Sequence, residues 1–101
     1  MDRIATLTEI LAQNPNDAFA RYGLAMEYSG QGNYTQSLEE FGKLLSTHPD
    51  YAAGYFMAAQ TLMKEDRVED AKEMLSDGIA AARRSKNSHA ESEMQAMFDE
   101  L

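Results

Sequence analysis

The chain has 101 residues, and 44% of them are apolar, so it is long enough for one small domain with a single hydrophobic core. Its 17 acidic and 9 basic residues give a formal net charge of −8, which argues against binding to nucleic-acid phosphates or to an anionic membrane surface. It contains no cysteine, which excludes a disulfide framework and a thiolate metal site.

No stretch approaches the roughly 18 apolar residues that a membrane helix needs. The segment from Met1 to Pro15 also lacks the basic start and apolar run of a secretory signal, because Asp2, Glu9 and Gln13 interrupt it. We therefore expect a cytoplasmic protein that does not associate with membranes.

The first two predicted helices span residues 2–13 and 18–30. Apolar residues of the first share one face, at spacings of three and four: Ile4, Leu7, Ile10 and Leu11. Pro15 breaks this helix, and Asp17 is a good N-cap for the next. The helix at 18–30 is apolar on more than one side, so neighbours must cover more than one side of it. Gly30-Gln31-Gly32 ends it.

Four further helices are predicted over residues 34–47, 51–64, 68–84 and 89–100. Leu38 and Phe41 are expected to point inward and the carboxylates Glu39 and Glu40 outward. The turn at Pro49 repeats the earlier break, with Asp50 as the expected cap. A polar hinge at 85–88 precedes the last helix. Its apolar stripe is typical of a helix that covers the open end of a stack: Ala90, Met94 and Met97.

The two prolines lie 34 positions apart, and the character of the helices recurs with the same period. Three sets of positions carry this recurrence: Leu7, Phe41 and Leu75; Leu11, Leu45 and Ile79; Ala25 and Ala59. A period near 34 built from two helices resembles the tetratricopeptide repeat. The resemblance implies an all-α fold in which antiparallel helix pairs stack as a short right-handed superhelix of about six helices.

Within one domain, residues 1–101, the resemblance implies four parts. They are a half-repeat helix at 2–15, repeats at 18–51 and 52–85, and a capping helix at 88–101. Small residues at Ala25, Ala59 and Ala71 fit the family pattern because they let helices approach closely. Two residues depart from it: Arg21 replaces a large residue, usually aromatic, and Arg83 replaces the closing proline.

In this family, the first helix of each repeat lines a groove that holds a peptide or a helix. The resemblance places these residues in the groove: Phe19, Tyr22, Met26, Ser29, Ala53, Phe56, Gln60 and Met63. It therefore implies a non-enzymatic protein-interaction module whose partner is a protein or peptide segment. An alternative is a homodimer or larger assembly that buries the same surface on itself.

No cofactor, metal site or catalytic group is predicted. His48 and His89 are far apart in the sequence, and Glu39-Glu40 is more typical of a solvated face than of paired catalytic carboxylates. Gly30-Gln31-Gly32 lacks the remaining residues of a phosphate-binding loop, so a turn explains it.

Overall fold

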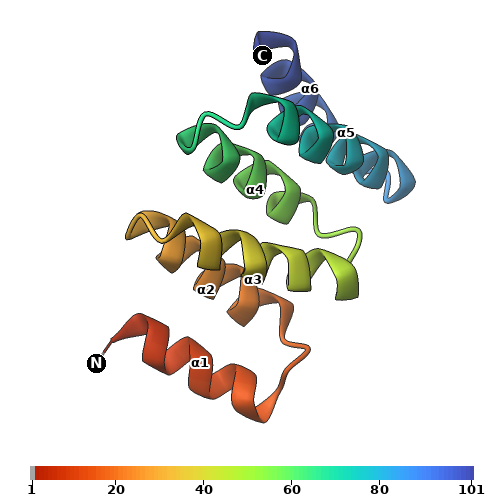
Figure 1. The fold of residues 1–101 in the computed structure, drawn as a ribbon. Helices are drawn as coiled ribbons and strands as arrows, with labels where there is room; N and C mark the ends of the chain where they lie inside the picture. The colour runs from red at the N-terminus through yellow and green to blue at the C-terminus, as the bar shows by residue number, and fades with distance from the viewer. Residues whose placement is uncertain (1) are drawn as a thin grey trace.

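The computed structural model describes residues 2–101, which form six α-helices (Figure 1). The helices are α1 (Arg3–Gln13), α2 (Ala18–Gly30), α3 (Tyr34–Thr47), α4 (Ala52–Lys64), α5 (Val68–Arg84) and α6 (Ser88–Glu100). Each predicted range agrees with the observed one to within a residue at either end, and the all-α fold is confirmed. Met1, which belongs to the predicted domain, lies outside the described residues.

The helices stack in chain order from α1 at one end to α6 at the other (Figure 1). Each packs against the next, and α4 also approaches both α2 and α6 with Cα atoms within 8 Å. No Cα atom of α3 lies within 8 Å of one in α5. Helices α2, α4 and α6 therefore lie close to one another, and we call them the inner layer. Helices α1, α3 and α5 are splayed, that is, farther apart from one another, and we call them the outer layer.

Two kinds of connection join the helices. Four-residue loops that contain Pro15 and Pro49 lead from α1 to α2 and from α3 to α4. Three-residue turns lead from α2 to α3, from α4 to α5 and from α5 to α6. In each turn the middle residue has a positive φ, at Gly32 (80°), Asp66 (57°) and Lys86 (58°). Without a proline near Arg83, α5 runs for 17 residues where α3 has 14.

The core forms where small residues of one helix meet large residues of the next. Phe41 of α3 and Leu75 of α5 occupy equivalent positions in the repeat, and both are 0% exposed. Met94 of α6 is 1% exposed, as its predicted stripe requires, and it sits against Gly78 of α5. An added Cβ on Gly54 of α4 would approach side-chain atoms of α3 to 3.0 Å, so this glycine also permits close packing.

Two sequence predictions are wrong. Glu40 does not point outward; it is 9% exposed, and its Oε1 lies 2.6 Å from Nη1 of Arg21. The partner belongs to the preceding helix, so the sequence of α3 alone does not identify it. Asp50 is not the cap of α4, because Tyr51 occupies the N-cap position. Asp50 instead pairs at 2.7 Å with Arg84, which lies in the last turn of the lengthened α5.

Candidate functional site

The eight predicted groove residues all lie on two neighbouring helices of the inner layer. α2 carries Phe19, Tyr22, Met26 and Ser29, and α4 carries Ala53, Phe56, Gln60 and Met63. Asp17 fixes the start of α2 by accepting a hydrogen bond from the Ala20 amide at 2.9 Å, as predicted for an N-cap. The repeat period brings the two sets to equivalent positions on adjacent helices.

On α2, the three apolar groove residues differ in exposure: Phe19 is exposed, and Tyr22 and Met26 are half-buried. Phe19 is 77% exposed, against 40% for Ile10 of α1, the other large apolar residue that is exposed in residues 2–101. Tyr22 is half-buried, with its ring 5.5 Å from that of Tyr51 and 6.3 Å from that of Phe41. Burial, reinforced by the neighbouring Tyr51, raises the pKa of the Tyr22 hydroxyl, so this group is neutral at physiological pH. Met26 packs against the same cluster.

Ser29 differs from the other predicted groove residues because it is buried. It is 6% exposed, and its Oγ lies 3.0 Å from Oγ1 of Thr61 on α4. The two hydroxyls join α2 to α4 through a buried hydrogen bond. The Ser29 side chain therefore holds the inner layer together and is not presented at the surface. Sequence analysis missed Thr61, which also donates to the carbonyl of Met57 at 2.9 Å.

On α4, Ala53 is exposed, and Phe56, Gln60 and Met63 are half-buried. Phe56 and Met63 pack against the core cluster that contains Leu62. One side of each therefore belongs to the core, and the other side faces the inner surface.

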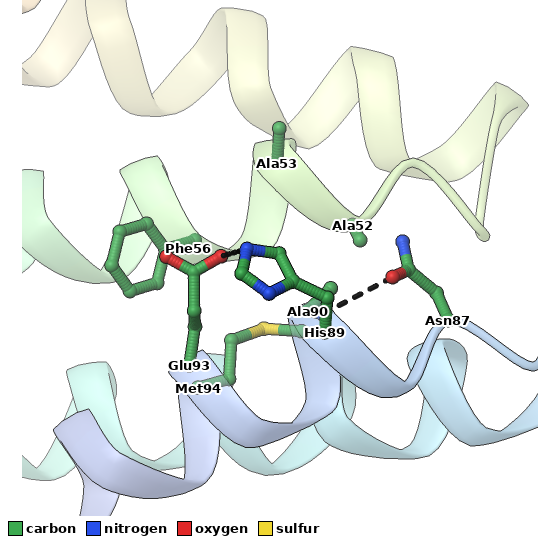
Figure 2. A pocket seen from close by; sticks show the side chains of 8 residues that line it. All are labelled: Ala52, Ala53, Phe56, Asn87, His89, Ala90, Glu93 and Met94. Carbon is green, nitrogen blue, oxygen red and sulfur yellow. Dashed lines mark hydrogen bonds and ion pairs between the residues drawn. The ribbon is translucent and has the colours of Figure 1, made fainter.

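A hollow of about 240 Å³ lies between α4 and α6, beside Phe56 (Figure 2). α4 provides Ala52, Ala53 and Phe56, α6 provides His89, Ala90, Glu93 and Met94, and Asn87 lies just before α6. Nε2 of His89 lies 3.0 Å from Oε1 of Glu93, and Asn87 caps α6 by accepting from the Ala90 amide at 3.1 Å. The hollow thus has an apolar lining and a polar edge.

The contribution of α6 was missed because the stripe of this helix was interpreted only as a cover for the end of the stack. The same turn of α6 that buries Met94 also sets Ala90 against α4. The repeat period contained a signal, since Tyr22, Phe56 and Ala90 follow one another at that period.

The chemistry of this surface is that of apolar contact. Among residues 2–101 the structure shows no group of three or more histidines, aspartates or glutamates arranged to hold a metal ion. In the same residues, no helix is both long enough and apolar enough to cross a membrane.

Comparison with known proteins identifies the family. Residues 28–90, more than half of the chain, match the model of the tetratricopeptide repeat family, and the chain belongs to that family. A search of curated protein sequences gave no match.

Solved structures agree with this assignment. The solution NMR structure of a tetratricopeptide repeat domain protein from Salinibacter ruber is 32% identical, with a TM-score of 0.80 over 86% of this chain and 88% of that one. A crystal structure of a tetratricopeptide repeat domain protein from the same organism is 32% identical, with a TM-score of 0.75 over 83% and 93% of the two chains. The solution structure of a protein from Bordetella parapertussis, 20% identical over 99% and 87%, has the same fold with a TM-score of 0.83.

Tetratricopeptide repeats generally mediate protein–protein interaction and are generally non-enzymatic scaffolds. This general role fits an inner layer whose surface carries aromatic and methionine side chains.

Proposed function

We propose that this chain is a non-catalytic interaction module that binds a peptide or a helix along its inner layer. Its binding surface, here called the inner face, comprises seven of the predicted residues: Phe19, Tyr22, Met26, Ala53, Phe56, Gln60 and Met63. Ser29 is left out because its hydroxyl is bonded to Thr61. The cytoplasmic location expected from the sequence stays a prediction.

The observation that carries this proposal is the hollow beside Phe56. Five of its eight lining residues are apolar: Ala52, Ala53, Phe56, Ala90 and Met94. An apolar side chain of a partner would be surrounded there by two helices, and Phe56 would contact it along one side. Methionine adapts its shape to different neighbours, which suits a site that accepts more than one kind of side chain.

Phe19 adds a second anchor at the other end of the inner face. This residue is 77% exposed, and covering a side chain of this kind is worth roughly 1.5–3 kcal/mol. A segment that runs from the hollow across α4 to α2 would cover both phenylalanines.

A homo-oligomer is the second candidate, and the exposure of Phe19 also supports it. A second copy could cover this ring as well as a partner could. In that case the protein would be a structural or assembly unit, and the inner face would be its interface.

The repeat division is part of the proposal. We infer that residues 2–15 are a half-repeat, that 18–51 and 52–85 are full repeats, and that 88–101 form a cap. The proline loops support the boundaries near residues 16 and 50, because both loops lead from the outer layer to the inner layer. The exposed residues of α6 support the cap, since all but Ala96 are polar: Ser88, His89, Ser92, Glu93, Asp99 and Glu100.

The test begins with peptides selected from a random displayed library for binding to the intact protein. Their affinity is then measured for the wild type, for Ala53→Glu and for Ala5→Glu. Both alanines are exposed in the first turn of a helix, so the two variants change charge and helix propensity alike. A carboxylate at position 53 would enter the hollow, and we expect it to weaken binding about tenfold or more.

Ala5→Glu should leave the affinity unchanged. Equal binding by all three proteins would contradict the inner face as the site. Light scattering coupled to size exclusion tests the alternative: a dimer that persists on dilution and is dissociated by Ala53→Glu would support the homo-oligomer instead.

A further inference from the structure

A second groove lies in the outer layer, between α3 and α5. Two hollows of about 310 and 410 Å³ adjoin there, and they share Gly42, Met74 and Asp77. Because the hollows share these lining residues, they form one continuous depression, here called the outer groove. It exists because α3 and α5 are splayed, with no Cα pair within 8 Å among the described residues.

The floor of the outer groove is apolar. Leu38, Gly42 and Leu45 follow one another on α3 at spacings of four and three, so they share one face of that helix. Met74 of α5 faces them across the groove. The two leucines and the methionine are half-buried, which leaves part of each side chain accessible to another molecule.

Gly42 is a glycine that packing within the chain does not explain. It lies in the interior of α3, where glycine is the least favourable residue other than proline. A Cβ at Gly54 or Gly78 would meet neighbouring atoms at 3.0 or 2.5 Å, whereas a Cβ at Gly42 would meet nothing within 4 Å. The missing side chain leaves bare helix backbone on the groove floor, where a partner can approach closely.

The charge of the outer groove is negative along its α5 wall. Glu73 and Asp77 lie one helical turn apart on one face of α5, and neither forms an ion pair within residues 2–101. Both arginines that line the groove are already neutralised. Arg67 pairs with Asp70 and Glu65, and Arg84 pairs with Asp50.

We propose that the outer groove binds a helix of a partner protein that carries an apolar stripe flanked by lysine or arginine. The stripe would lie on Leu38, Leu45 and Met74, with its backbone close to Gly42. The flanking cations would pair with Glu73 and Asp77. This surface belongs to a different layer from the inner face, so the protein could join two partners.

A synthetic helical peptide tests the proposal directly. The probe has about 18 residues of leucine and lysine, with leucines at spacings of three and four so that they form one stripe. The control peptide replaces every lysine by glutamate. In a titration followed by amide NMR shifts, we expect the lysine peptide to shift Gly42, Met74 and Asp77, and the glutamate peptide to shift none of them.

Two variants separate groove binding from general attraction to an acidic protein. Glu73→Lys with Asp77→Lys should weaken the lysine peptide about tenfold or more. Glu9→Lys with Glu100→Lys changes the net charge equally at two exposed positions outside the groove, and should change affinity less than about threefold. Equal weakening by both pairs would overturn the proposal in favour of non-specific electrostatics.

Gly42→Leu fills the groove without changing any charge. We expect it to lose peptide binding while its urea midpoint stays the same or rises, since nothing lies within 4 Å of the added carbon. Wild-type affinity in Gly42→Leu would overturn the proposal. If Ala53→Glu lost affinity for the peptide and Gly42→Leu did not, the peptide would bind at the inner face. That result would refute the outer groove as a binding site and would leave the proposed function standing.

Discussion

The α2–α3 pair and the α4–α5 pair have the same backbone plan but reach it with different side chains. In the first pair, Nη2 of Arg21 donates to the carbonyl of Pro15 at 3.1 Å. In the second, the hydroxyl of Tyr55 donates to the carbonyl of Pro49 at 2.6 Å. Arg21 and Tyr55 are one repeat period apart, and so are the two prolines. What the repeat preserves at this position is a hydrogen bond that ties the helix to the preceding loop.

The side chain that donates this hydrogen bond determines which residue must pack against it. Arg21 carries a charge into a half-buried site, and Glu40 neutralises it at 2.6 Å. The position one repeat period after Glu40 is Met74, which lines one hollow of the outer groove together with Tyr55. A charged couple in one pair therefore corresponds to a tyrosine and a methionine in the other, and these two residues line part of the groove.

The largest effect on stability is expected when only one member of the Arg21–Glu40 pair is replaced by its counterpart in the second pair. Arg21→Tyr would leave the Glu40 carboxylate, with side-chain exposure of 12%, facing only Lys43 at 3.4 Å. An inadequately paired buried charge is strongly destabilising, and we expect a loss of about 3 kcal/mol in the free energy of unfolding, measured by urea denaturation.

The double variant Arg21→Tyr with Glu40→Met copies the second pair into the first. It should recover most of the lost stability, because replacing both members of a buried ion pair by apolar groups is often neutral. If the double variant were as unstable as the single one, the two couples would not be interchangeable and the comparison would fail.

A smaller effect is expected where the two pairs differ in the size of one residue. Leu44 of α3 is fully buried, and the equivalent residue of α5 is Gly78. A Cβ at Gly78 would stand 2.5 Å from Sδ of Met94 and 2.6 Å from Cβ of Tyr55. The methionine can move, but the tyrosine Cβ is fixed to the backbone, so Gly78→Ala should cost about 2 kcal/mol in unfolding free energy.

Gly42→Ala is the control for this substitution, because its Cβ meets nothing within 4 Å. It should stabilise the protein by about 0.5–1 kcal/mol through helix propensity alone. The two glycine-to-alanine changes should thus shift the urea midpoint in opposite directions. Shifts of the same sign would show that the packing around Gly78 has room for a methyl group.

The smallest effect is expected at the turns. Gly32 and Asp66 occupy the same place in their pairs, with φ of 80° and 57°. Gly32→Ala should destabilise by about 1 kcal/mol because a side chain is strained there, and Asp66→Gly should stabilise by about 0.5 kcal/mol. Thermal unfolding of both variants, with Asp66→Ala as the control, measures this difference between the two turns. A Gly32→Ala variant that is more stable than the wild type would contradict the prediction.

Most of the fold could be predicted because its signals are local and periodic. Pro15 and Pro49 mark helix ends, and the recurrence of Leu7, Phe41 and Leu75 fixes which faces point inward. The resemblance then supplied the way in which the helices stack. Glu40 was wrongly placed because its periodic position is an inward one, and polarity outweighed position in the interpretation.

The candidate site was less predictable, because the hollow beside Phe56 and the outer groove depend on distances between helices that periodicity does not contain. The hollow beside Phe56 requires α6 to turn back onto α4, and it does so through Lys86 at φ 58°. The sequence predicted a polar hinge at 85–88, but lysine is not favoured in that conformation, so the residues of the hinge did not indicate that α6 turns back onto α4. The outer groove requires α3 and α5 to be splayed, which no single residue signals.

The order of packing along the stack has a kinetic consequence. Every helix approaches only those one or two places away in the chain, and α1 approaches α2 alone. Structures with such short-range contacts form rapidly and open from their ends in steps. The backbone amides of α1 should therefore exchange with deuterium well before those of α4, and α1 can detach while the hollow beside Phe56 and the outer groove both remain assembled.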